Sequence, residues 1–405
     1  MRGKRKIAPM SAREYQAIFG LAAIFAVRML GFFLILPVLS LYATTLEGYR
    51  PALVGLAIGI YGLTQACLQI PFGMLSDRIG RKPVIVAGLL IFIAGSIIAA
   101  LAEDFSGLVI GRAVQGAGAV ASAIIALTAD LTRPEKRTTG MAIIGMTIGA
   151  SFVLSMLIGS IISDLIGVPG IFWVTAVLGA IGIVILLLIV PKPEQAPKPV
   201  SDLASQFVES LKNNSLLRLD AGIFILHGIL MAMFVVIPFS LSEHAGLAQG
   251  EFWKVYVPVM LLSGVFMFPL ILFADRKQKV KPVFLTAIGI LILSQIVLSQ
   301  MFTDLTGIAG GLLLFFIGFN VLEATLPSLV SKVAPAHSKG TAVGLYSTFQ
   351  FLGAFVGALV GGIIYDLWGI GSVYIFIIGA LICWLVIALG MSRQRYLGAV
   401  EVNQE

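Results

Sequence analysis

The sequence predicts an all-α polytopic membrane protein with 12 transmembrane helices. Of its 405 residues, 59% are hydrophobic and only 12% are charged, against about 25% charged residues in a typical soluble domain. Because a membrane helix needs about 20 apolar residues, this apolar content suffices for about twelve spans. The apolar runs are long and unbroken, which argues against a soluble protein, a disordered protein and a β-barrel, whose strands alternate in polarity.

The apolar runs place the spans in order along the chain. In the first half we predict them at 15–42, 52–76, 83–102, 105–132, 138–165 and 169–191. In the second half we predict them at 219–243, 252–274, 282–302, 306–333, 339–366 and 370–391. The first run follows the basic residues Arg2 to Lys6 and is too long for the core of a signal peptide, so we interpret it as the first span.

The longest polar segment, about 192–218, separates the two halves. Four prolines stand at its start, and three apolar residues then follow at four-residue spacing: Pro191, Pro193, Pro197, Pro199, Leu203, Phe207 and Leu211. This pattern predicts a linker and a short amphipathic helix on the membrane surface; a solvated linker with incidental apolar residues is the alternative. The predicted domains are a six-helix bundle (1–191), the linker (192–218), a second six-helix bundle (219–391) and a cytoplasmic tail (392–405).

The distribution of positive charge predicts the orientation. Of the 27 Lys and Arg residues, 23 fall in the termini and in alternate loops, whereas the opposite loops hold only Arg50 and Lys254. Since positive loops stay in the cytoplasm, both termini are expected there. The net charge of +7 forms no basic stripe, so we expect no nucleic-acid partner. Cys67 and Cys383 lie inside apolar runs, where free cysteines behave as small apolar side chains, so we expect no disulfide and no metal site.

The two halves resemble one another at an offset of about 200 residues. The matches are Pro37 with Pro238, Asp77-Arg78 with Asp275-Arg276, Pro83 with Pro282, Pro134 with Pro335, Gly140 with Gly340, and Asp164 to Gly167 with Asp366 to Gly369. Two parallel six-helix repeats place a substrate site at their interface near the bilayer midplane.

The loop between spans 2 and 3 carries the most specific motif, Gly73 to Lys82. It matches the signature G-x-x-x-D-R-x-G-R-[RK] of the major facilitator superfamily, which the chain resembles over its whole length. The resemblance implies a cytoplasmic latch in which Asp77 faces residues 339–341 and Arg78 or Arg81 reaches Asp130. The predicted latch residues are Gly73, Asp77, Arg78, Gly80, Arg81 and Asp130. An ordinary positive loop is the alternative, and the second-half copy is degenerate, with Ile271 in place of the first glycine.

Four ionisable residues fall inside spans 1, 4, 7 and 10, which line the cavity in this superfamily. They are Arg28, Arg112, His227 and Glu323, and we predict a role in proton coupling for them; for His227 the alternative is a satisfied structural residue. Because an intramembrane carboxylate is costly, Glu323 is a candidate proton carrier; the alternative is a static bridge to Arg28. Arg112 begins a stretch similar to the R-x-x-Q-G-x-G-A pattern of proton-coupled members, so we expect it to tune a nearby carboxylate or, alternatively, to bond backbone carbonyls.

Aromatic and amide side chains on the spans are candidates for an apolar substrate cavity. We select Phe32, Tyr61, Phe316 and Asn320; the alternative is that these aromatics face lipid or the protein core. Span 5 departs from the antiporter pattern, because Val153-Leu154 stands where Gly-Pro is expected.

Several stretches are similar to the YajR-type branch of proton-coupled drug-efflux (drug:H+ antiporter) carriers, among them residues 28–31, 59–66, 70–73, 324–329 and 346–353. That branch is similar in ending with an additional C-terminal soluble domain, whereas this sequence stops at Glu405; the domain is either naturally absent or has been removed.

This resemblance implies a monomeric secondary transporter of the inner membrane that exports lipophilic or cationic small molecules. It would use the proton gradient and no cofactor, and its partners would be substrate, protons and lipid. A proton symporter or uniporter importing a metabolite is the alternative. We find no G-x-x-x-x-G-K-[ST] phosphate loop and no H-E-x-x-H motif, so we do not expect an enzyme or an ATP-driven pump.

Overall fold

The computed structural model describes residues 9–193, 203–335 and 338–391, and these residues are almost entirely helical. The first half contains α1 (Ala12–Phe33), α2 (Leu39–Ala43), α3 (Pro51–Ile79), α4 (Arg81–Ala100), α5 (Phe105–Ala117), α6 (Ala121–Asp130) and α7 (Pro134–Leu188). The second half contains α9 (Asn214–Phe239), α10 (Trp253–Arg276), α11 (Val280–Met301), α12 (Leu305–Val333), α13 (Lys339–Trp368) and α14 (Ile370–Leu389). Between them lies α8 (Leu203–Lys212).

The described residues contain eleven helical stretches that are long and apolar enough to cross a membrane. One of them, Glu135–Leu188, has 54 residues, or about 80 Å of helix, far more than the roughly 30 Å of a bilayer core. Its backbone leaves the helical region at Gly167, where φ is 72°. It therefore holds two spans, and the predicted fold of twelve spans is confirmed.

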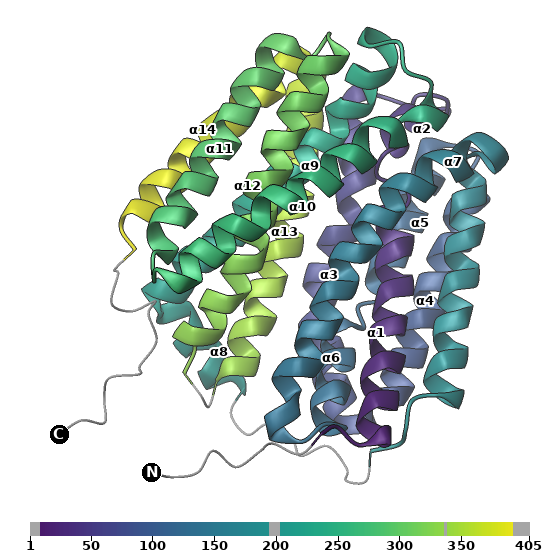
Figure 1. Cartoon of the computed structure of the whole chain (residues 1–405). Coiled ribbons are helices and arrows are strands. Elements are labelled where there is room, and N and C mark those ends of the chain that lie inside the picture. Colours follow the sequence, from purple (N-terminus) through teal and green to yellow (C-terminus); the bar gives the residue numbers. More distant parts are fainter. Residues whose placement is uncertain (1–8, 194–202, 336–337, 392–405) are drawn as a thin grey trace.

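The chain forms two helical bundles side by side (Figure 1). In that view the second half, green to yellow, stands beside the first half, purple to teal, and α8 lies at one end of the molecule. We call the end with α8 and the Gly80 turn the linker end, and the end with α2 and the 3-10 helix Gln249–Glu251 the closed end. The predicted 192–218 interval contains α8, whereas Pro197, Pro199, the basic N-terminus and the 392–405 tail lie outside the described residues.

Three spans differ from the predicted ranges for physical reasons. Span 1, predicted as 15–42, ends as α1 at Phe33 and resumes as α2, because Pro37 cannot donate a backbone hydrogen bond and clashes with the preceding turn. Span 4, predicted as 105–132, breaks between α5 and α6, where a side chain at Gly118 would overlap with the Gly88 carbonyl of α4. Span 7, predicted as 219–243, begins at Asn214, since the Asn213 side chain caps it.

Matching contacts in the two halves support the internal repeat. Lys82 donates to the Leu186 carbonyl oxygen at 3.0 Å, and Lys281 donates to the Leu389 carbonyl oxygen at 2.8 Å. Each ammonium thus caps the end of the last helix of its bundle, where the carbonyls lack intrahelical partners. Asp104 and Asp304 likewise cap the first turns of α5 and α12.

The halves meet toward the closed end. Glycines of α3 lie directly against the α13 backbone, and a side chain at Gly55 would overlap with the Ala358 carbonyl oxygen. Two hydrogen bonds also cross the interface: Ser40 Oγ donates to the Phe234 carbonyl oxygen at 2.8 Å, and Gln249 Nε2 donates to Ser163 Oγ at 2.8 Å. In contrast, a Cβ added at Gly340, at the linker end of α13, would have nothing within 4 Å. The described halves therefore pack closely toward the closed end, whereas the start of α13 is open beside Gly340 at the linker end.

Candidate substrate and proton site

Glu323 lies in the middle of α12 and meets side chains from two other helices. His227 Nδ1 of α9 is 3.9 Å from Glu323 Oε2. Gln350 Nε2 of α13 lies 3.4 Å from Glu323 Oε1 and 2.8 Å from His227 Nε2. The Glu323 side chain keeps 34% of its surface accessible. The Oε2 atom is buried and has no hydrogen-bond partner among the described residues, so the carboxyl group has polar neighbours and is accessible only in part.

The contact with Gln350 favours one tautomer of His227. An amide nitrogen only donates hydrogen bonds, so with the amide nitrogen of Gln350 at His227 Nε2, that ring nitrogen accepts and the ring proton sits on Nδ1, the atom that faces Glu323. The backbone of α12 is also unusual at Glu323. Pro327 lies four residues further along the helix and has no backbone N–H, so it cannot donate to the Glu323 carbonyl oxygen.

The two predicted arginines lie elsewhere, in the first half. Arg28 is 1% exposed and donates through Nη2 to the Gln65 amide oxygen. Arg112 is fully buried, donates to Gln115 Oε1 at 2.5 Å, and stacks 5.0 Å from the Tyr61 ring centroid. Across the described chain, neither guanidinium meets a carboxylate, so the structure brings His227 to Glu323 but not the arginines.

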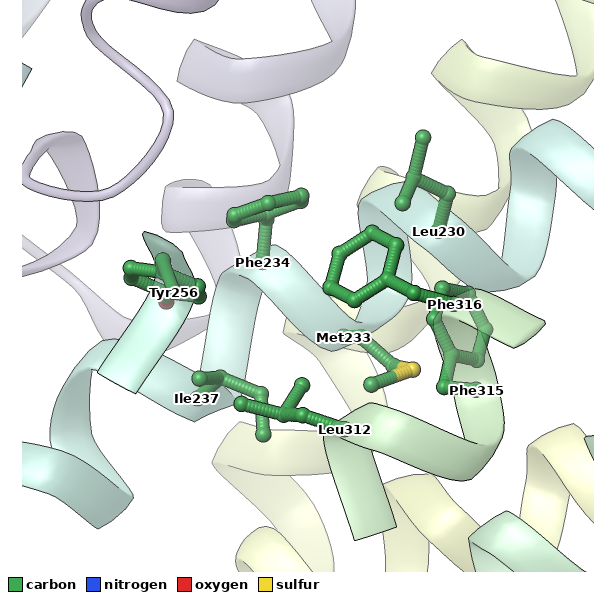
Figure 2. A pocket seen from close by; sticks show the side chains of 8 residues that line it. All are labelled: Leu230, Met233, Phe234, Ile237, Tyr256, Leu312, Phe315 and Phe316. Atoms are coloured by element: carbon green, nitrogen blue, oxygen red, sulfur yellow. The ribbon is translucent and has the colours of Figure 1, made fainter. Parts of the chain in front are cut away.

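The predicted cavity residues divide between two places. Phe32 and Tyr61 stack at 4.5 Å between ring centroids inside the first half, under Arg112. Asn320 Nδ2 donates to Ser263 Oγ of α10 at 3.1 Å. Phe316 lines a small apolar cavity in the second half, shown in Figure 2, whose walls are Leu230, Met233, Phe234, Ile237, Tyr256, Leu312, Phe315 and Phe316.

A side chain from the first half closes the region around this cavity. The Phe152 ring of α7 lies 5.9 Å from the Phe316 ring and 6.2 Å from the Phe234 ring, measured between centroids. This aromatic contact joins spans 5, 7 and 10 at the interface of the halves.

The loop motif forms an ionic cluster around one arginine. Arg81 Nε donates to Asp130 Oδ2 at 3.1 Å, and Arg81 Nη1 bonds Ser76 Oγ at 2.7 Å and pairs with Asp77. Gly80 makes the tight turn with a φ of 101°. Of the two arginines considered for Asp130, Arg81 makes the contact, whereas Arg78 is exposed.

The predicted contact between Asp77 and residues 339–341 has no counterpart among the described hydrogen bonds and ion pairs. Thr341 instead donates to Gln206 Oε1 of α8 at 2.9 Å. Gly73 of the same motif lies against α6, where a Cβ would approach Ser122 Oγ to 3.2 Å. The loop is therefore tied to its own half in this conformation.

Sequence reasoning missed Gln350, although it joins Glu323 to His227. It belongs to a stretch that we used only as a mark of resemblance. Tyr346 and Gln350 stand four residues apart, which places both on one helix face. That spacing, on a helix packed closely against α9, is the signal that could have found them.

Comparison with known proteins gives a consistent result. Residues 21–358 match the description of the Major Facilitator Superfamily. The chain is 44% identical to "Inner membrane transport protein YajR" of Escherichia coli K12, over 97% of this chain and 87% of that protein. It is 27% identical to "Multidrug resistance protein MdtH" of Aeromonas salmonicida, over 84% of this chain and 85% of that protein.

Solved structures match the fold at low sequence identity. A bacterial homologue of the human lysosomal transporter Spinster, in an inward-facing and occupied conformation, superposes with a TM-score of 0.77 at 15% identity. The match covers 96% of this chain and 98% of that one.

Proposed function

The chain belongs to the major facilitator superfamily of transporters, and we propose that it is a proton-coupled antiporter that exports lipophilic or cationic small molecules by alternating access. The observation that carries the proposal is the position of Glu323, which is accessible in mid-span and lies beside His227 and Gln350. A carboxyl group that can be reached from outside and is set in apolar surroundings can bind and release a proton as its surroundings change.

The aromatic lining supports a lipophilic substrate. Phe152, Phe234 and Phe316 meet where the two halves join, and ring faces attract both apolar groups and cations. A relative named as a multidrug resistance protein is consistent with such a substrate. Deprotonated Glu323 would supply the counter-charge for a cation, so proton and substrate would compete for one site.

We place the protein in the inner membrane with the linker end in the cytoplasm. The excess of Lys and Arg on that side supports this orientation, and so does the name of the relative YajR. The closely packed end then faces outward, which corresponds to an inward-facing conformation. In the opposite conformation the linker end closes, and Asp77 would reach the start of α13 as the latch residue.

One observation favours the alternative, import of an anionic metabolite with or without protons. Two nitrogens on each of Arg28 and Arg112 have no hydrogen-bond partner in the protein. An anionic substrate could satisfy them if the first half opened. Both arginines are almost fully buried, and for that reason we prefer the exporter.

The test uses everted membrane vesicles that are made acidic inside, with a dye that is quenched by low pH. Tetraphenylphosphonium is added to wild type, to Glu323→Gln and to a control, Glu251→Gln, which changes an exposed acid paired with Lys254. Proton release in wild type and the control, but not in Glu323→Gln, is expected. If Glu323→Gln released protons at the wild-type rate, the coupling role would be wrong. If wild type responded to anions and to no cation, the metabolite carrier would replace the exporter.

A further inference from the structure

A second carboxylate is buried in the same half as Glu323. Asp220 of α9 is 1% exposed, and neither of its carboxyl oxygens forms a hydrogen bond with any of the described residues. Because α9 starts at Asn214, Asp220 lies within the helix in its second turn from the linker end. A buried carboxylate with no partner is costly, so a role in binding protons would account for it.

Tyr346 lies on α13 one helical turn before Gln350 and interacts electrostatically with both carboxylates. It is 6% exposed, and its hydroxyl has no hydrogen-bond partner among the described residues. It shares the face of α13 with Gln350, which contacts Glu323. The phenol therefore connects the Glu323 site to the part of α9 nearer the linker end.

Close packing of α9 against α13 holds Asp220 and Tyr346 in place. Side chains at Gly353 and Gly357 would overlap with the backbone of α9 at Phe224 and Gly228, so α9 and α13 lie in direct backbone contact. Asp220 precedes His227 by seven residues, or two helical turns, which is about 10 Å along α9. Asp220 and His227 therefore share a face of α9 and differ in their depth in the membrane.

We propose that Asp220 is a second proton-binding site that passes protons between Glu323 and the linker end through the Tyr346 hydroxyl. In the conformation described these groups are not hydrogen-bonded to one another, so the transfer takes place when side-chain motion brings them into hydrogen-bond distance. Protonated Glu323 then gives its proton to the phenol oxygen, and the phenol gives its own proton to the Asp220 carboxylate. Glu323 becomes a carboxylate, Asp220 becomes a carboxylic acid and Tyr346 is unchanged. Asp220 then releases the proton to water at the linker end.

Among the described residues, no cationic side chain is hydrogen-bonded to Asp220. Arg218 is two residues away, which places it on a different face of the helix, and it donates to the Gly390 carbonyl oxygen. The neighbouring α14 carries no charged side chain. Glu209 and Lys212 lie on α8 at the linker end, where the proton would leave. The proposal rests on proton coupling by Glu323, and it adds the route of the proton.

The first test needs no substrate. Infrared difference spectra of the purified protein between acidic and alkaline pH report the carbonyl stretch of protonated carboxylic acids. We expect one component to be lost in Asp220→Asn and a second to be lost in Glu323→Gln. Glu323→Gln should also shift the midpoint of the Asp220 component, because the two sites interact. A spectrum unchanged by Asp220→Asn would overturn the proposal, whatever the substrate of the carrier.

The second test separates proton transfer from substrate binding. In proteoliposomes, proton-driven tetraphenylphosphonium transport should fall at least about tenfold in Asp220→Asn and Tyr346→Phe, because positioned proton-transfer groups contribute factors of this size or larger. Exchange of labelled for unlabelled tetraphenylphosphonium, which needs no net proton transfer, should stay near wild type. Asp220→Glu should restore transport.

A matched control and a second variant keep this test decisive. Tyr374→Phe removes another buried phenol of the same half, whose hydroxyl is 3.5 Å from Ser240 Oγ, and it should behave as wild type. If Asp220→Asn does not fold, Tyr346→Phe carries the test alone. Wild-type proton-driven transport in either variant would overturn the proposal. If wild type showed both infrared components but no transport of the cation, the export proposal would fail and the Asp220 site would stand.

Discussion

Glu323 and His227 face each other across the α9–α12 contact, with 3.9 Å between Oε2 and Nδ1. The two residues are 96 positions apart in the sequence, and each also contacts the Gln350 amide. The first prediction tests this triangle of polar side chains.

Gln350→Leu should slow proton-driven transport and change its pH dependence. The substitution removes the hydrogen bond to His227 Nε2 and the contact with Glu323 while it keeps similar volume. A hydrogen bond to a charged group contributes about 1.5 kcal/mol, which corresponds to about a tenfold change in rate. The measurement is the pH profile of tetraphenylphosphonium transport in proteoliposomes. Gln300→Leu, at an exposed position, is the control, and identical profiles for the two variants would contradict the prediction.

Arg81→Ala should impair transport, whereas Arg78→Ala should not. Arg81 joins Asp77, Ser76 and Asp130, and the loss of one such contact costs about 1 kcal/mol. Arg78 has the same charge but is exposed. Thermal unfolding and transport of both variants are compared at equal expression.

Asp77→Asn extends this comparison to the proposed latch. It should leave insertion and thermal stability close to wild type but slow the transport cycle, because the neutral side chain interacts less well with the start of α13 when the linker end closes. Normal transport by Asp77→Asn would show that the latch is not needed.

Gly55→Ala should favour the conformation in which the closed end opens. Its Cβ would overlap with the Ala358 carbonyl oxygen across the interface of the halves, and such overpacking costs about 1–3 kcal/mol, enough to change a two-state equilibrium by about 5- to 150-fold. The measurement is labelling of a cysteine at Ser40, in a background without Cys67 and Cys383, by a thiol reagent that does not cross the membrane.

Gly379→Ala is the matched control, because a Cβ at Gly379 would have nothing within 4 Å. Labelling should increase in Gly55→Ala alone. Equal labelling of the two variants would mean that the α3–α13 contact does not limit opening.

Asp304→Asn should remove part of the pH dependence of stability. The Thr306 hydroxyl and the Gly307 N–H, which hydrogen-bond the Asp304 carboxylate, hold its pKa below the usual range. The folded-state pKa is therefore lower than the unfolded value of about 3.9, so the stabilisation is present above pH ~4 and is lost as the pH falls through the folded value. Wild type should melt at a higher temperature than Asp304→Asn at neutral pH, and the difference should vanish at strongly acidic pH. A difference independent of pH would contradict this prediction.

Local features of the sequence were enough to predict most of the fold. The length of an apolar run decides whether it can span a bilayer, so twelve spans could be counted without knowing any contact. Pro37 and Gly118 were harder to interpret. Their effects are a break after α1 and a break between α5 and α6, and the second break depends on how closely α4 approaches Gly118.

The site was only partly predictable for a related reason. An ionisable residue inside an apolar run, such as Glu323, can be recognised from its neighbours in sequence. Which partner it meets depends on the rotation of each helix about its axis. Arg28, considered as a partner of Glu323, bonds Gln65 instead, and Arg112 stacks on Tyr61. Asp220 was placed near a helix end because the predicted span began at 219, whereas α9 begins at Asn214.

The sequence by itself determined that this is a membrane protein of two six-helix repeats with a charged loop after the second span and one acid deep in span 10. These properties are set by composition, run length and local motifs. Only the tertiary structure decided that Glu323 meets His227 and Gln350, that Asp220 is buried without a hydrogen-bond partner among the described residues, and that the halves pack closely toward one end. The physical reason is that glycine contacts such as Gly353 with Phe224 fix the separation and rotation of helices far apart in sequence.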